Sequence, residues 1–329
     1  MVRRVGLLTA AVAWCGCFDP TLNTIECGVA DLCPPGLVCD DFDRCVEPRE
    51  ADAGAEIDAP SNDVDSDGVP NEMDNCRDVA NSGQFDEDGD DVGDACDNCP
   101  AHANSMQEDT LEIDANEAAD GVGDACDPRP ARAGDSIAFF DGFNVDLSQW
   151  TVARGPMTWT VLSGALIQTS REIGFGALTW NGAPPAHGQI VTRAKATELR
   201  PEDGGQDDFR AVGVLAQYDP SAAGEGDGYT CTHFYDPGVN AGDTELVLAT
   251  VAGDFTPTSM IEAPNLTVDQ AVDYALRVRD GNQRCMSGVE GQELETQATS
   301  TRYDSGLVGL VTHSVPGSFE FALIFDLGE

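Results

Sequence analysis

Aspartate residues recur at fixed intervals in two stretches of this chain, residues 63–74 and 86–97. In both stretches an oxygen-bearing side chain stands at positions 1, 3, 5, 9 and 12, and a valine at position 7 offers its backbone carbonyl. This is the ligand spacing of loops that bind calcium, a hard cation that takes about six to eight oxygen atoms. The predicted ligands are Asp63, Asp65, Asp67, Val69, Asn71 and Asp74 in the first loop, and Asp86, Asp88, Asp90, Val92, Asp94 and Asp97 in the second.

A third stretch, residues 116–127, repeats the pattern incompletely, because Ala118 stands at position 3 where the other loops have aspartate. Seven extra residues separate Gln107 from this loop, by comparison with the spacing between Gln84 and the second loop. We expect weaker or altered calcium binding here, with Asp109 or Asp114 folding back as a substitute ligand. The other predicted ligands, at positions 1, 5, 9 and 12, are Asn116, Asp120, Asp124 and Asp127.

The recurring Asp, Asn, Gln, Gly and Cys residues of segment 63–128 resemble the thrombospondin type 3 repeat, most clearly in "DSDGVPNEMDNC". The resemblance implies a chain with almost no hydrophobic core, which wraps around calcium ions and is pinned by disulfides between successive cysteines. It therefore implies the pairs Cys76–Cys96 and Cys99–Cys126. It also favours a structural role for calcium, which would hold a stalk rigid. A disordered acidic linker is the alternative.

The charge of the chain excludes two classes of partner. The net charge is -42, and residues 61–127 carry 21 Asp and Glu against one basic residue, Arg77. Lys195 is the single lysine of the sequence. Nucleic acid and anionic lipid both need clusters of Lys and Arg to hold their phosphates. We therefore expect no nucleic-acid partner and no electrostatic hold on a membrane surface.

The N-terminus, "MVRRVGLLTAAVAWCGC", has a basic start and a short apolar run. This pattern predicts a signal peptide over residues 1–16, too short to span a bilayer. The sequence before Cys17 resembles a bacterial lipobox, which implies lipidation of Cys17. The predicted location is therefore the cell surface or outer membrane of a bacterium, with the lipid as the only membrane contact. An ordinary signal peptide, with Cys15 and Cys17 both kept or both removed, is the alternative.

Two short segments follow. Residues 17–45 form a small module whose evenly spaced cysteines predict two disulfides, although zinc binding is an alternative and three connectivities remain open. Residues 46–62 are rich in Ala, Asp, Glu and Pro and predict a disordered linker. The cysteines of the module are Cys27, Cys33, Cys39 and Cys45.

The rest of the chain, residues 135–329, predicts a β-sandwich or jelly roll. Apolar runs that alternate with polar residues recur between turn signals, and Asp280-Gly281 predicts a tight hairpin. Cys231 and Cys285 both fall in such runs, so we expect a cross-strand disulfide, with two buried free thiols as the alternative. The strand-like runs are residues 136–143, 157–168, 189–196, 211–218, 228–235, 244–251, 272–278, 283–289, 306–311 and 319–325.

These runs resemble concanavalin A-like and laminin G-like domains, which implies a lectin type of sandwich. The resemblance rests on Trp150, Trp159, Gly164 and Leu166 near the start, and on Gly306, Gly309 and Phe321 near the end. Glycosidases with this fold carry paired carboxylates on one strand. No ExDxE motif is present, and "EGQELE" at 290–295 lacks the alternation that would put its acids on one face.

The sequence therefore favours a non-catalytic protein that takes part in adhesion or binds a glycan or extracellular matrix. A structural envelope protein and a divergent glycoside hydrolase are the alternatives. Two polar, glycine-rich loops, residues 200–209 and 219–229, are candidate ligand loops. Four aromatic residues could stack on a sugar or simply pack in the protein. Four aspartates could hold another calcium ion. Three histidines have no recognisable nucleophile motif beside them. These residues are Trp180, Tyr218, Tyr229 and Tyr235; Asp207, Asp208, Asp219 and Asp227; and His187, His233 and His313.

Overall fold

The chain divides into two compact units, Met1–Met73 and Asp74–Glu329, which we describe separately. The structure is a computed structural model. In the part of the chain that it describes, no helix is long and apolar enough to cross a membrane. The described residues are 38–39, 45–46, 62–156, 158–170, 174–198, 210–224, 226–235, 244–252, 255–264, 266–289 and 291–328.

The first unit contains a pair of two-residue strands and most of the first acidic loop. Strand β1 (Val38–Cys39) pairs antiparallel with β2 (Cys45–Val46), and Val38 lies opposite Val46. The predicted signal peptide, the lipidated Cys17 and most of the linker lie outside the described residues. So do the side chains of the four cysteines in the predicted N-terminal module, and their pairing stays a prediction.

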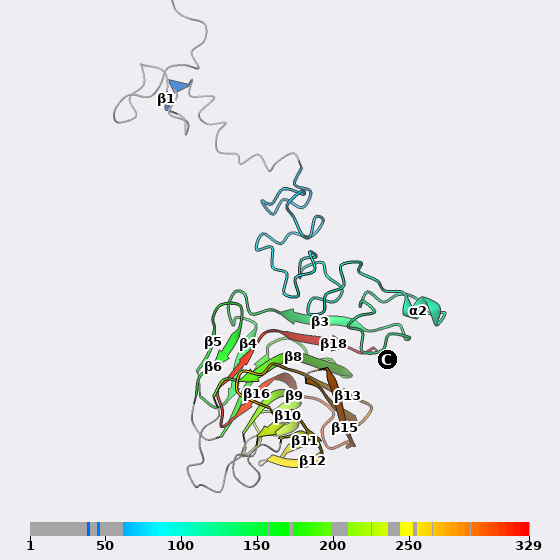
Figure 1. Cartoon of the computed structure of the whole chain (residues 1–329), viewed down its shortest axis with the longest axis vertical. Helices are drawn as coiled ribbons and strands as arrows, with labels where there is room; N and C mark the ends of the chain where they lie inside the picture. The colour runs from blue at the N-terminus through cyan, green and yellow to red at the C-terminus, as the bar shows by residue number, and fades with distance from the viewer. Residues whose placement is uncertain are drawn as a thin grey trace, which may run out of the picture. The chain divides into compact units, whose positions relative to one another are not determined.

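The second unit begins with the acidic repeats, which are built almost entirely from turns (Figure 1). Over residues 74–134 the structure has no strand and one short helix, α2 (Leu111–Asp114). Two disulfides close this segment, Cys76–Cys96 and Cys99–Cys126, each with its Cα atoms 5.6 Å apart. Both pairs are those that the thrombospondin resemblance implied.

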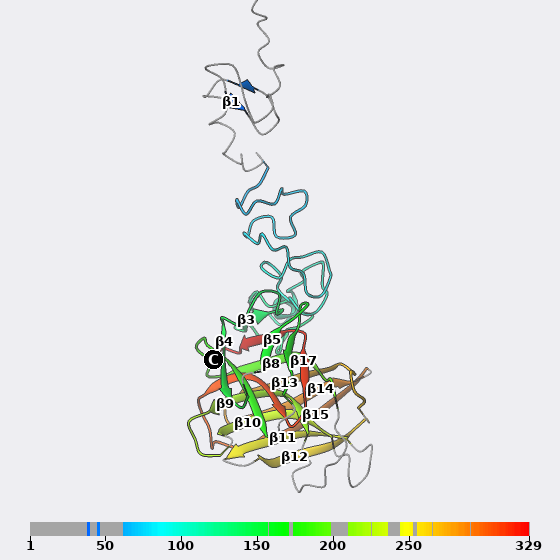
Figure 2. The same ribbon diagram turned by 90° about the vertical axis from the view of Figure 1, so that its left-hand side faces the viewer.

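Two antiparallel sheets then form a sandwich (Figure 2), as the alternating runs predicted. The first sheet has seven strands in the spatial order β12, β11, β10, β9, β16, β7 and β4. Their bounds are β4 (Trp150–Arg154), β7 (Phe175–Trp180), β9 (Ala211–Asp219), β10 (Asp227–Tyr235), β11 (Thr244–Ala252), β12 (Phe255–Ala263) and β16 (Leu307–His313).

The second sheet has nine strands, seven of them in the order β15, β14, β13, β8, β17, β6 and β5, while β18 pairs with both β8 and β3. Their bounds are β3 (Ser136–Asp141), β5 (Trp159–Val161), β6 (Leu166–Gln168), β8 (Gly188–Ala196), β13 (Val272–Arg279), β14 (Asn282–Val289), β15 (Gln292–Thr299), β17 (Gly317–Phe319) and β18 (Ala322–Asp326).

The hairpin between β13 and β14 is confirmed. Asp280 and Gly281 have φ angles of 50° and 72°, and Arg279 pairs directly with Asn282. Successive positive φ angles are typical of the tight turns that fit the twist of two antiparallel strands. The predicted runs do not include β4, β7, β12, β15 or most of β17. Strands β12 and β15 are largely polar and exposed, and β4 and β17 are short.

The main core lies between the two sheets and includes Leu166, Leu310 and Phe319, none of which has exposed surface. The disulfide Cys231–Cys285 lies inside this core. The predicted pair is therefore confirmed, but it joins β10 of one sheet to β14 of the other. It is a link across the sandwich, because both cysteines occupy inward-facing positions of their strands.

A second apolar cluster lies on the outer face of the nine-stranded sheet, along β18 and β8, where the acidic repeats pack (Figure 1). Strand β18 alternates, so that Ile324 faces the main core while Leu323 and Phe325 face outward. Ala101 and Val122 of the repeats cover these outward side chains, and Val122 has no exposed surface. The repeats are thus docked on the sandwich.

Candidate metal centre

The first acidic loop brings three of its predicted ligands together. One carboxylate oxygen from each of Asp63, Asp65 and Asp67 lies within 4.8 Å of the others. Backbone amides hold these side chains inward: Gly68 donates to Asp63 Oδ2 at 3.1 Å and Val69 donates to Asp67 Oδ1 at 2.8 Å. Such a cluster of oxygens suits a hard cation.

The second loop has the same geometry. Asp86, Asp88 and Asp90 each bring one oxygen within 4.8 Å of the others. The Asp91 amide donates to Asp86 Oδ2 at 3.1 Å and the Val92 amide donates to Asp90 Oδ1 at 2.9 Å. These bonds match those of the first loop position by position. The loop is therefore a repeated unit whose aspartates are fixed by their own backbone.

Burial makes ionisation of the carboxyl groups in the second loop unfavourable when no cation is bound. The pKa of Asp88 is raised to about 6 by burial and by the neighbouring Asp90. Burial also raises the pKa values of Asp94 and Asp97. A bound divalent cation would relieve this cost, because an opposite charge favours the ionised carboxylates.

Glutamine side chains donate hydrogen bonds to the aspartate at position 12 of each of the first two loops. Gln84 Nε2 donates to Asp74 Oδ1 at 2.9 Å, and Gln107 Nε2 donates to Asp97 Oδ1 at 2.7 Å. The two repeats thus use the same contact 23 residues apart. This explains why Asn and Gln recur among the aspartates.

The third loop starts at Asp109, which takes the structural place of Asp86. The Gly121 amide donates to Asp109 Oδ2 at 2.9 Å, as Asp91 does to Asp86 in the second loop. The Thr110 amide donates to Asp124 Oδ1 at 3.0 Å, which matches the bond from Glu87 to Asp94. Of the two proposed substitutes, Asp109 joins the site and the exposed Asp114 is not among its grouped ligands.

One residue of this loop was missed by the sequence analysis. Glu112 of α2 brings a carboxylate oxygen within 4.8 Å of both Asp109 and Asp124, and likewise of both Asp120 and Asp127. The seven-residue insertion was the available signal, because it had to fold somewhere beside the loop. Asn116 follows α2, and its amide donates to Ile113 O at 2.9 Å.

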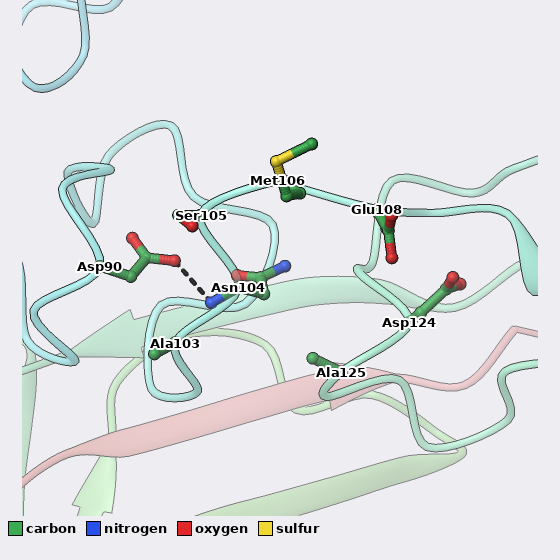
Figure 3. Close-up of a pocket in the computed structure, with 8 residues that line it drawn as sticks. All are labelled: Asp90, Ala103, Asn104, Ser105, Met106, Glu108, Asp124 and Ala125. Atoms are coloured by element: carbon green, nitrogen blue, oxygen red, sulfur yellow. Dashed lines mark hydrogen bonds between the residues drawn. The ribbon is translucent and has the colours of Figure 1, made fainter.

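A surface hollow of about 430 Å³ separates the second and third loops. Asp90 and Asp124 lie on opposite sides of it, and Met106 projects from its rim (Figure 3). The Asn104 amide donates to Asp90 Oδ2 at 2.6 Å. This bond ties a ligand of the second loop to the chain that leads into the third.

A second hollow, which we call the junction groove, lies between the repeats and the outer face of β13, β14 and β15. It measures about 480 Å³, and its lining includes His102 of the repeats and Asp273, Met286, Glu293 and Glu295 of the sandwich. Glu293 and Glu295 stand on one face of β15, which corrects the expectation that the acids of "EGQELE" would not share a face. Residues two apart in a strand point to the same side.

Hydrogen bonds and ion pairs fix part of this groove. Arg193 Nε donates to Asp273 Oδ1 at 2.7 Å, and Arg284 Nη2 donates to Glu295 Oε1 at 2.7 Å. Burial lowers the pKa of His102, because it disfavours the charged imidazole. The groove thus offers carboxylates, an imidazole and an apolar floor around Met286.

Three of the candidate aromatic side chains and one of the candidate histidines pack in the interior of the sandwich or against its aromatic residues. Tyr218 and Tyr229 are 1% exposed, so neither can stack on a sugar. Trp180 stacks on Phe139 with ring centroids 4.9 Å apart. His233 is fully buried, bonded to Ser287 at 2.8 Å, and its pKa is lowered to about 4 by burial. The side chain of Tyr235, and Asp207 and Asp208 of the possible further calcium site, lie outside the described residues.

The sequence comparisons agree with the repeats. The family model of the thrombospondin type 3 repeat matches residues 49–84, a range that includes the first loop. The comparison with curated proteins found no match.

The comparison with solved structures found several distant similarities. The carbohydrate binding module CBM66 from Bacillus subtilis is 11% identical, with a TM-score of 0.41, over 53% of this chain and 93% of that chain. The exoplasmic/lumenal domain of VIP36, in a form bound to Ca2+ and Man2, is 13% identical, with a TM-score of 0.41, over 54% and 81%. A xylan beta-1,4-xylosidase from Bacillus Halodurans C-125 is 15% identical, with a TM-score of 0.43, over 59% and 40%.

Proposed function

We propose that this chain is a calcium-binding, lipid-anchored cell-surface protein of a bacterium, and that it acts without catalysis in adhesion or in binding a glycan or extracellular matrix. Calcium binding is supported by the clustered carboxylates of all three loops and by the match to the thrombospondin type 3 repeat. The three described disulfides support an oxidising, extracellular environment.

The observation that carries the binding role is the junction groove. Its walls come from two different parts of one unit: His102 belongs to the repeats, and Asp273 and Glu293 belong to the sandwich. Concave sites with a few placed polar groups over an apolar floor are typical of ligand sites. Sugar hydroxyls can donate to the carboxylates while a ring lies on Met286. Because the repeats form one wall, calcium loading would shape the site.

A glycan-array screen of the full mature chain, with calcium and again with chelator, tests this function. We expect binding that weakens when calcium is removed. The variant Glu293→Gln should weaken it further, whereas Glu262→Gln, an exposed acid on β12 away from the groove, should not. An absence of hits from folded, calcium-loaded protein would refute glycan binding, and release of reducing sugar from a bound glycan would refute the non-catalytic role.

A further inference from the structure

The carboxylate of Glu112 is fully buried and lies beside the carboxylates of Asp109 and Asp127. The residue has no exposed surface, and neither of its carboxylate oxygens accepts a hydrogen bond from any residue that the structure describes. Buried atoms Asp109 Oδ1 and Asp127 Oδ2 are in the same state. A buried carboxylate without a partner is strongly unfavourable, so buried charges are paired or bind metals.

We propose that the third loop binds a divalent, oxygen-seeking cation such as calcium, that Glu112 of the inserted helix is its replacement ligand, and that this cation stabilises the start of the sandwich. The first part rests on the calcium-binding role proposed above. The other two parts go beyond it, since they assign a ligand from outside the repeat pattern and a role for the cation in stabilising the sandwich.

The ligand set follows from the two groups that meet at Glu112. One group contains Asp109, Glu112 and Asp124, and the other contains Glu112, Asp120 and Asp127. Glu112 therefore stands between them and takes the place of the aspartate that Ala118 lacks at position 3. Each group offers three carboxylates, the kind of ligand that calcium prefers, and Glu112 belongs to both groups.

The same carboxylates also bind the chain where it enters β3. Asp120 Oδ2 accepts hydrogen bonds from the amides of Gly134 at 2.9 Å and Asp135 at 2.7 Å. Asp127 Oδ1 accepts from the Arg129 amide at 2.5 Å. The Arg129 side chain in turn pairs with the buried Asp135 and donates to the carbonyl of Leu327, just after β18.

A strand of the sandwich completes this connection. Arg277 of β13 donates through Nη2 to the carbonyl of Pro128 at 2.8 Å. The loop that holds Glu112 is therefore bonded, through adjacent residues, to both the first and the last strands of the sandwich. A cation that fixes Asp120 and Asp127 would also fix these bonds.

Calcium titration of the full mature chain by calorimetry, after removal of bound metal, tests the ligand assignment. Glu112→Gln keeps the size of the side chain and removes its charge. We expect at least one calcium to be lost from the stoichiometry, or its affinity to fall by roughly a hundredfold or more, since even outer partners of a metal site contribute about 10- to 100-fold. Glu108→Gln, an exposed acid four residues earlier, should titrate as wild type.

Hydrogen exchange at saturating calcium tests the connection to the sandwich. We expect Glu112→Gln to speed exchange of the β3 and β18 amides and to leave those of β9 and β10 unchanged. Unaltered calcium stoichiometry and affinity in a folded Glu112→Gln variant would overturn the ligand assignment. Loss of an ion without faster exchange in β3 and β18 would overturn the connection. Glycan binding is not measured in either experiment, so failure of the glycan proposal is distinguishable from failure of this one.

Discussion

The repeats from residue 74 onward and the sandwich reach a fixed structure by opposite means, although they belong to one compact unit. The sandwich buries apolar side chains such as Leu310 and Phe319 between two sheets. The repeats bury carboxylates such as Asp90, Asp97 and Glu112, and they gain their order from turns and disulfides. The first arrangement is stable through the hydrophobic effect, and the second depends on what neutralises its charge.

The contrast predicts a large and local effect of calcium removal. Chelation of the full chain should abolish most hydrogen-exchange protection in residues 74–127, because the carboxylates then repel one another. The inner strands β9 and β10 should keep their protection. Exchange followed by mass spectrometry measures both regions in one sample. Protection of the repeats that survives complete calcium removal would show that their disulfides and amide contacts suffice.

The stability of the sandwich should depend on the apolar side chains of its core rather than on calcium. Leu310→Ala removes a fully buried side chain and should lower the free energy of unfolding by about 2–5 kcal/mol. Leu162→Ala, at a residue that is 64% exposed, should change it by no more than about 0.5 kcal/mol. Urea unfolding with calcium present measures both. Equal effects of the two variants would contradict the placement of the core.

A smaller effect is expected where the two regions meet. The backbone of Val122 belongs to the third loop, and its side chain packs on the sandwich. Val122→Ala should lower the free energy of unfolding by about 2 kcal/mol, because two buried methyl groups are lost. Val145→Ala, at a residue that is 73% exposed, is the matched control. A Val122→Ala variant as stable as the control would argue that the repeats do not rest on the sheet.

The smallest effect concerns pH in the calcium-free protein. Burial and the neighbouring Asp94 raise the pKa of Glu87 from 4.5 to about 7. A carboxyl group whose pKa is higher in the folded chain stabilises the fold while protonated, so this contribution is complete below about pH 4.5 and is lost as pH rises through about 7. The melting temperature without calcium should therefore be higher near pH 5 than near pH 8.

The variant Glu87→Gln sharpens this test, because it removes the titrating group from the surface that faces Asn144. It should flatten the dependence of the melting temperature on pH, whereas Glu72→Gln, at an exposed site, should not. A calcium-free melting temperature that rises steadily from pH 5 to pH 8 would contradict the assigned direction of the pKa shift.

Much of the fold could be read from local patterns. Alternation of apolar and polar residues predicted most strands, and Asp280-Gly281 predicted its hairpin, because both depend on short stretches of backbone. Strand β15 was missed because its outer face carries charged residues such as Glu293. The continuous apolar run at 321–325 was a further signal in the sequence, since a strand that is apolar on both faces must be covered on both.

The sequence by itself determined the ligand spacing of the first two loops, because the positions of oxygens in a short loop follow from the backbone between them. The repeat pattern likewise implied the two disulfides of the repeats. Only the tertiary structure decided that Glu112 enters the third loop, that Val122 docks on β18, and that Cys231 and Cys285 join different sheets. These contacts join chain segments that sequence spacing does not relate, because they depend on how distant parts of the chain fold against one another.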